Sequence, residues 1–196
     1  MTTKDPYRVQ TQLEGRFTLG NVGYGKLRRL ALRCPQVLWD ARIGEKLAKI
    51  TTLEEMELPD GETTIEEGFW EALCEHGENG GVKLKRLIAP RISMSFLNYL
   101  QSYEGLEWLE FDCFYAPVST DDNPRSLMDP FFKKALPKHR GTLKVLALCG
   151  RVAHRVGWRM TESDLEAILA CEELAMLTIP GRQPFIEAVS KLSLTD

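Results

Sequence analysis

Apolar residues recur along the chain in the spacing L-x-x-L-x-L, with other hydrophobic residues replacing some of the leucines. Successive copies start 26, 31, 22, 37 and 31 residues apart. In an extended segment the side chains alternate between two faces, so the fourth and sixth positions of a copy point to the same side. Each copy therefore predicts a short strand with one apolar face. The six copies begin at Leu27, Leu53, Leu84, Leu106, Leu143 and Leu174.

Segments with apolar residues at helical spacing lie between these copies. Thr64 with Glu67, and Thr161 with Asp164, have the spacing of a capping box, in which each residue caps the backbone of the other. A strand that is followed each time by a helix predicts parallel strands and an α/β fold. The predicted helices span residues 40–50, 64–74, 93–103, 129–136 and 161–171, and a last helix carries Phe185, Val189 and Leu192.

This pattern resembles that of leucine-rich repeat proteins, whose repeats are about 20 to 29 residues long. The resemblance covers roughly residues 17–192 and implies an α/β solenoid of about six repeats, with a parallel sheet on the concave side and short helices on the convex side. The uneven repeats lack the usual Asn or Cys at the ninth position and are similar to the irregular repeats of F-box proteins, although we find no F-box in the 26 residues before the first copy. The ninth positions hold Pro35, Gly61, Ile92, Phe114, Arg151 and Arg182.

A single domain is expected from this arrangement. Residues 1–26 are interpreted as an N-terminal cap, which includes a weak strand pattern at 16–19, and residues 27–192 as the repeat domain. Two long intervals between copies indicate loop insertions near residues 113–128 and 150–160. The second insertion combines Arg155 with Trp158, residue types that are enriched at protein interfaces, and it is interpreted either as a partner contact or as a folded loop anchored by Trp158.

Charged residues alternate in sign at equivalent positions of successive copies. In a parallel stack these positions become neighbours, so opposite charges are expected to face each other across strands. We interpret this part of the sheet as a structural charge ladder. The third positions hold Arg29, Glu55 and Arg86, and the second positions hold Arg28, Glu54, Lys85, Glu107 and Lys144.

The third-position series continues with Trp108, Val145 and Met176. Three apolar side chains that face away from the core predict an exposed stripe, and such stripes mark partner sites. Glu110 and Asp112 fall on the same side of their strand, which favours a partner with a basic rim. The alternative is that one of the two insertions folds over the stripe and buries it.

Gly20 to Lys26 satisfies G-x-x-x-x-G-K, the spacing of a loop that cradles phosphates in nucleotide-binding proteins. The next residue is Leu27, whereas the motif requires Ser or Thr, and a strand rather than a helix is predicted to follow. A turn before a strand is therefore the preferred interpretation of this segment. Nucleotide binding by the Gly20 to Lys26 loop is kept as the alternative function.

The chain of 196 residues has a formal net charge of −3, which indicates no general attraction to nucleic acid or anionic membranes. Its five cysteines form no C-x-x-C pair, its three histidines share no metal-ligand spacing, and we find no catalytic motif. No apolar run has the length of a signal peptide core or a membrane helix. We expect reduced thiols, no metal, no cofactor and a cytoplasmic location, with the nucleus as the alternative.

Together these observations predict a non-enzymatic scaffold for protein–protein interaction. Its suggested type is a module similar to the substrate receptors of larger assemblies. Neither nucleic acid nor membrane is expected as a partner. The sequence specifies neither the protein partner nor the oligomeric state. The predicted partner-binding residues are Trp108, Val145, Met176, Glu110, Asp112, Arg155 and Trp158.

Overall fold

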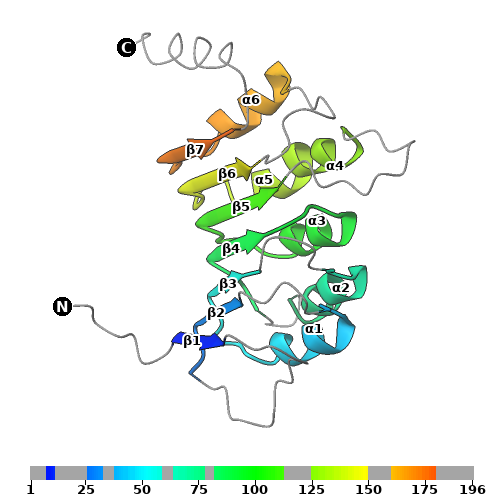
Figure 1. Cartoon of the computed structure of the whole chain (residues 1–196). Helices are drawn as coiled ribbons and strands as arrows, with labels where there is room; N and C mark the ends of the chain where they lie inside the picture. Colours follow the sequence, from blue (N-terminus) through cyan, green and yellow to red (C-terminus); the bar gives the residue numbers. More distant parts are fainter. Residues whose placement is uncertain are drawn as a thin grey trace, which may run out of the picture.

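The computed structural model contains one parallel sheet of seven strands, which follow one another in chain order (Figure 1). The structure describes residues 8–11, 26–32, 38–58, 64–77, 82–112, 125–149 and 160–179. Every pair of neighbouring strands is parallel, so each connection between them must return to the same edge of the sheet. The strands are β1 (Arg8–Thr11), β2 (Arg29–Leu32), β3 (Glu55–Glu57), β4 (Arg86–Ala89), β5 (Trp108–Asp112), β6 (Val145–Cys149) and β7 (Met176–Thr178).

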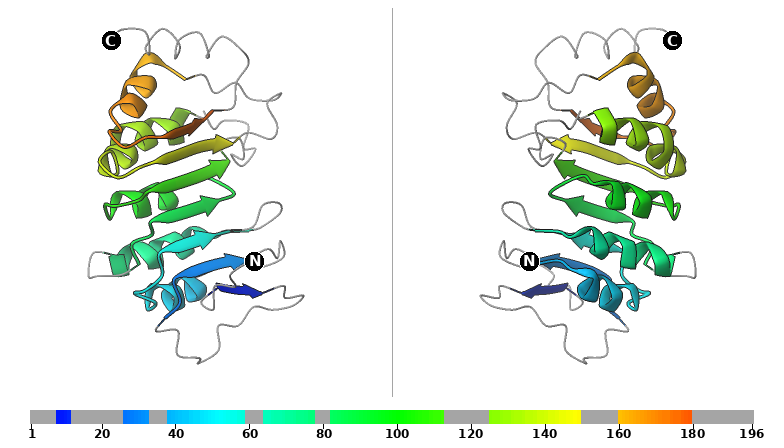
Figure 2. Two further views of the ribbon diagram at one scale, coloured as in Figure 1. Left: turned by 90° about the vertical axis from the view of Figure 1, so that its left-hand side faces the viewer. Right: turned by 90° about the vertical axis from the view of Figure 1, so that its right-hand side faces the viewer.

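The helices lie on one face of this sheet, and no described helix lies on the other face (Figure 2). The fold is therefore α/β, with a parallel sheet that helices cover on one side. No described helix is long and apolar enough to cross a membrane. The helices are α1 (Ala41–Ala48), α2 (Glu67–Gly77), α3 (Met94–Gln101), α4 (Arg125–Pro130), the π-helix η1 (Phe131–Ala135), α5 (Leu136–Lys138) and α6 (Glu162–Leu169).

The leucine spacing places its apolar positions between the sheet and the helices. Leu30, Met56, Leu87, Leu109 and Leu146, the fourth positions of five copies, are neighbours across the sheet and are all buried. Buried aromatic rings continue this core along the helical layer in edge-to-face contacts, an arrangement that adds to their burial energy. They form the chain Trp39, Phe69, Trp70, Phe96, Phe111, Phe131 and Phe132.

Helix starts follow the capping chemistry of the sequence in three places. The side chains of Asp40 and Ser93 accept hydrogen bonds from backbone N–H groups in the first turns of α1 and α3. The capping box of Thr161 and Asp164 at the start of α6 is confirmed. The box predicted at Thr64 is wrong, because α2 begins at Glu67 and the backbone at Thr64 bonds to Trp39 in an isolated parallel bridge.

Three further predictions about the elements need correction. Strand β1 was missed, because its residues Arg8–Thr11 lack the leucine spacing. The last part of the expected insertion at 113–128 is helical, since α4 begins at Arg125. The helix predicted at 129–136 contains a π-helical segment between Pro130 and Pro137, two residues that cannot donate a backbone hydrogen bond. The strand predicted at 16–19 and the helix predicted after Pro184 lie outside the described residues.

Candidate functional site

The open face of the sheet carries the two predicted rows of charged residues in the predicted register. Arg29 pairs with Glu55, Glu55 with Arg86, and Arg86 with Trp108 at successive Cα positions. The Arg29 guanidinium lies 3.2 Å from the Glu55 carboxylate. The alternation of sign therefore produces contacts between neighbouring strands, as the charge ladder predicts.

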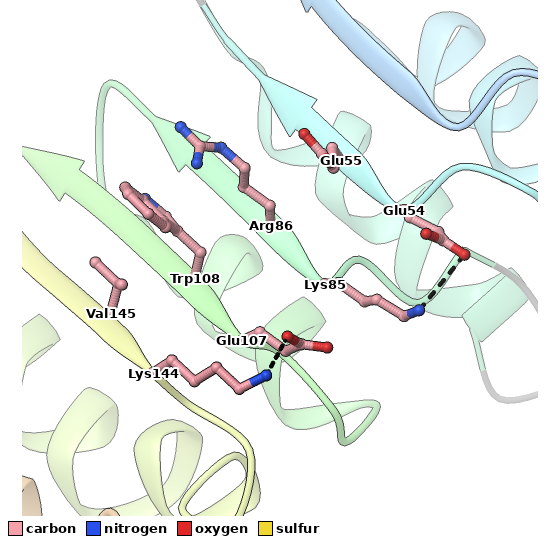
Figure 3. A pocket seen from close by; sticks show the side chains of 8 residues that line it. All are labelled: Glu54, Glu55, Lys85, Arg86, Glu107, Trp108, Lys144 and Val145. Atoms are coloured by element: carbon pink, nitrogen blue, oxygen red, sulfur yellow. Dashed lines mark hydrogen bonds and ion pairs between the residues drawn. The ribbon is translucent and has the colours of Figure 1, made fainter. Parts of the chain in front are cut away.

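A shallow pocket lies over strands β3 to β6 on this face, with a volume of about 390 Å³. Its lining combines three acidic and three basic side chains with one aromatic ring and one aliphatic side chain (Figure 3). The pocket is therefore close to neutral overall, although the whole chain is acidic. The lining residues are Glu54, Glu55, Lys85, Arg86, Glu107, Trp108, Lys144 and Val145.

Trp108 and Arg86 form the middle of the pocket. The guanidinium carbon of Arg86 lies 4.0 Å from the centroid of the Trp108 ring, within the range of a cation–π contact. Because the two residues are register partners on adjacent strands, the sheet itself holds the planar guanidinium against the ring. The indole N–H of Trp108 finds no hydrogen-bond acceptor among the described residues. The result is a flat, cationic platform on the open face.

Two lysines flank this platform, and each contacts a glutamate on a neighbouring strand (Figure 3). The Lys144 ammonium lies 2.7 Å from the Glu107 carboxylate, and the Lys85 ammonium lies 3.5 Å from the Glu54 carboxylate. The hydrogen bond to Glu107 raises the pKa of Lys144, so this lysine stays charged. The pocket thus presents fixed positive charges, two of which are already paired with carboxylates.

The predicted exposed stripe is only partly present. Trp108 is half-buried and Met176 is 53% exposed, but Val145 between them is 8% exposed and Ala147 is also 8% exposed. The centre of the stripe is therefore covered. The prediction of a continuous exposed apolar stripe is wrong for the residues that the structure describes. Trp108 and Val145 meet in the pocket, whereas Met176 lies on the last strand, outside the pocket lining.

The remaining predicted site residues lie elsewhere. Glu110 is half-buried, and the Cys149 thiol donates to its carboxylate over 3.6 Å. Asp112 is the last residue of β5 and its Cα pairs with that of Cys149. Arg155 and Trp158 lie outside the described residues, as does the predicted phosphate loop up to Gly25. Of the predicted partner-binding residues that the structure describes, Trp108 and Val145 line the pocket.

The basic residues of the pocket were not among the partner-binding residues predicted from the sequence, although Lys85 was considered for the alternative nucleotide-binding function. Lys85, Arg86 and Lys144 were assigned to the charge ladder, whereas the structure places them around Trp108. The sequence did contain a signal for this arrangement. Arg86 and Trp108 occupy the same position of consecutive copies, so the predicted register makes them neighbours. Among the residues that the structure describes, no cluster of three or more His, Cys, Asp or Glu is placed to hold a metal ion.

The comparison with curated proteins finds similarity to DNA polymerase IV. The chain is 34% identical over 83 residues to the DNA polymerase IV of Pasteurella multocida strain Pm70, and 33% identical over 82 residues to those of Vibrio vulnificus strains YJ016 and CMCP6. Each similarity covers 42% of this chain and 22% of the relative, so the chain spans about a fifth of the length of the curated relatives it matches. No protein family model matches the chain. No solved structure matches it either.

These relatives are named for an enzyme that synthesises DNA, and they overturn three predictions. The non-enzymatic protein-interaction scaffold is wrong, the exclusion of enzyme function is wrong, and the exclusion of nucleic acid is wrong. The first two rested on the repeat pattern, and a fold does not determine function. The third rested on the net charge of −3, an average over the whole chain that does not report basic groups gathered in one place.

Proposed function

We propose that this chain has a DNA-polymerase-related function, in which the open face of the sheet binds a DNA strand at the pocket around Trp108. The observation that carries the proposal is the platform of Arg86 and Trp108, flanked by Lys85 and Lys144. The similarity to DNA polymerase IV over 42% of the chain supports nucleic acid as the class of ligand.

The chemistry of the pocket suits a single strand. Proteins that bind single-stranded nucleic acid combine aromatic or guanidinium surfaces, on which bases stack, with basic groups that contact phosphates. A base stacked on the Arg86 and Trp108 platform leaves its phosphates within reach of the two lysine ammonium groups.

For the architecture, we propose that the strand and helix units stack as leucine-rich repeats, with the irregular lengths seen in F-box proteins. Support comes from the buried fourth positions and from the chain-order parallel sheet. The division into a cap at 1–26 and a repeat domain at 27–192 stays a prediction, and so does a cytoplasmic location.

Fluorescence anisotropy with a labelled twelve-nucleotide oligothymidine tests the proposed function. The wild-type chain is expected to bind at low salt, and Trp108→Ala is expected to weaken binding by about 1–3 kcal/mol, the value of one stacked base. Arg86→Gln is expected to weaken it as well, while leaving the ring in place. Thermal unfolding of each variant separates loss of binding from loss of folding.

The control is Lys46→Gln, which removes one positive charge from the exposed surface of α1 in the helical layer. This change is expected to leave affinity close to the wild-type value. If folded Arg86→Gln and Trp108→Ala bind the oligonucleotide as tightly as Lys46→Gln does, the pocket is not the binding site and the proposal is overturned.

A further inference from the structure

Glutamates separate the lysines along the second-position row of the open face. Lys85 and Lys144 directly precede strands β4 and β6, and Glu107, which directly precedes β5, lies between them. Glu54 stands on the other side of Lys85. Because neighbouring strands are about 4.8 Å apart, the backbones of the two lysines are separated by roughly 10 Å, and Glu107, between them, places its carboxylate 2.7 Å from the Lys144 ammonium. A phosphate backbone that crosses the sheet therefore meets a negative charge between every two positive ones.

The same carboxylates also hold the lysine ammonium groups. Glu107 accepts a hydrogen bond from Lys144 over 2.7 Å, and Glu54 pairs with Lys85 over 3.5 Å. A phosphate must displace or share these partners to contact the lysines. Arg86 differs, because its guanidinium lies on the Trp108 ring rather than in any of the ion pairs across the row. The platform is thus available to a base. The two lysines, in contrast, are already paired with carboxylates, and a phosphate must compete with these carboxylates for them.

The volume of the pocket also indicates a short bound segment of DNA. Its volume of about 390 Å³ lies near the lower end of the range for small-molecule sites, roughly 300 to 1,000 Å³. It holds about one nucleotide. Glu54 and Glu107 belong to the lining of this pocket, so the phosphates of further nucleotides would have to pass these two carboxylates.

We infer that Glu54 and Glu107 are specificity-determining residues that limit the bound DNA to a single nucleotide at the Arg86 and Trp108 platform. This inference rests on the proposed function, since it concerns the same pocket. The two carboxylates act as intramolecular competitors for the phosphates on either side of the stacked base. Replacing the two glutamates should therefore let more nucleotides of the DNA strand contact the protein.

The test compares the wild type with the double variant Glu54→Gln, Glu107→Gln, using a thymidine dinucleotide and a twelve-nucleotide oligothymidine. The wild type is expected to bind both with similar affinity, and the variant is expected to bind the longer strand at least about tenfold more tightly. The salt dependence gives an independent readout, because log K falls by about 0.7 per log[salt] for each phosphate neutralised on a single strand. Two additional phosphate contacts steepen the slope by about 1.4.

The matched control is Glu45→Gln, Glu71→Gln, which makes the same change in net charge on exposed positions of α1 and α2. It is expected to keep the wild-type length preference and salt slope. If the pocket variant behaves like this control while the wild type binds DNA, the inference is overturned and the proposed function stands. If only the pocket variant binds, the wild type holds no nucleotide for the carboxylates to limit, so the inference and the proposed function both fail. If no protein binds, both fail.

Discussion

At the residue scale, His139 shows how the core constrains protonation. The side chain is 2% exposed, its Nδ1 accepts a hydrogen bond from the Leu106 N–H, and its Nε2 donates to the Leu100 carbonyl over 3.0 Å. This pattern requires the neutral imidazole with the proton on Nε2. Burial lowers the pKa of His139 to about 4, and the bond to Leu100 offsets this only in part.

The free energy of unfolding should therefore fall as the pH is lowered from 7 to 5. In this window the unfolded chain takes up a proton on His139, whose ordinary pKa is 6.5, whereas the folded chain does not. A pKa difference of this size corresponds to a loss of about 2 kcal/mol at pH 5 relative to pH 7. Urea unfolding at the two pH values measures it.

The control for this prediction is His139→Gln, whose amide can accept from Leu106 and donate to Leu100 without titrating. This variant is expected to be less stable at pH 7 and to lose markedly less stability on acidification. An equal loss in the variant and the wild type would show that other groups cause the pH dependence.

At the element scale, α1 packs most closely on α2 at Gly44. A Cβ at Gly44 would lie 2.6 Å from the Phe69 carbonyl oxygen and 2.9 Å from the Ala72 Cβ. Neither neighbour can move without shifting helix α2, because one is backbone and the other is attached directly to it. The absence of a side chain at Gly44 thus sets the distance between the two helices.

Gly44→Ala is expected to destabilise the fold by about 1–3 kcal/mol through overpacking. This cost opposes and exceeds the gain of up to about 1 kcal/mol that alanine brings to a helix interior. Gly141→Ala is the control, since a Cβ there meets nothing within 4 Å. Thermal unfolding measures the stability of both variants. If Gly44→Ala is as stable as Gly141→Ala, α1 and α2 can move apart at little energetic cost and the account is contradicted.

The strands are linked by the charge ladder on the open face. Glu55 lies between Arg29 and Arg86 in the register, and its carboxylate is 3.2 Å from the Arg29 guanidinium. Both side chains of the pair are about a third exposed, so solvent screens their attraction. The ladder therefore contributes to register more than to overall stability.

Glu55→Lys should lower the free energy of unfolding by about 1 kcal/mol or less, because it places three positive charges side by side. Adding Arg29→Glu is expected to restore part of the loss, and raising the salt concentration should shrink it. A double-mutant cycle by urea unfolding gives the coupling between the two positions. Zero coupling would contradict a stabilising contact across β2 and β3.

At the scale of the whole molecule, the strands and their register were predictable because one repeated spacing sets both. Leu53, Leu84 and Leu106 start copies whose third positions became Cα partners, and the capping pair Thr161 and Asp164 identified a helix start by local chemistry alone. Strand β1 was not predictable, because Arg8–Thr11 lacks the leucine spacing that marks the other strands; it pairs in parallel with β2.

The site was less predictable than the fold, since it depends on which residues the register brings together. The ladder prediction placed Arg86 next to Trp108, but only the three-dimensional structure shows the guanidinium over the ring and the two lysines nearby at the starts of β4 and β6 (Figure 3). The expected stripe failed at Val145, which is 8% exposed, because strand alternation fixes the face on which a side chain lies but not whether other parts of the chain cover it. The net charge led to the wrong exclusion of nucleic acid, because it is a sum over the chain and does not say where the basic groups lie.

Photocrosslinking with an oligonucleotide that carries 5-iododeoxyuridine tests most directly whether DNA binds on the open face at Trp108. After digestion with trypsin, mass spectrometry should find the crosslink in the peptide spanning residues 92–125, which contains Trp108, with fragmentation placing it on that ring. Trp108→Ala is expected to remove it. A crosslink that maps to the helical layer, or one that persists unchanged in folded Trp108→Ala, would contradict the account.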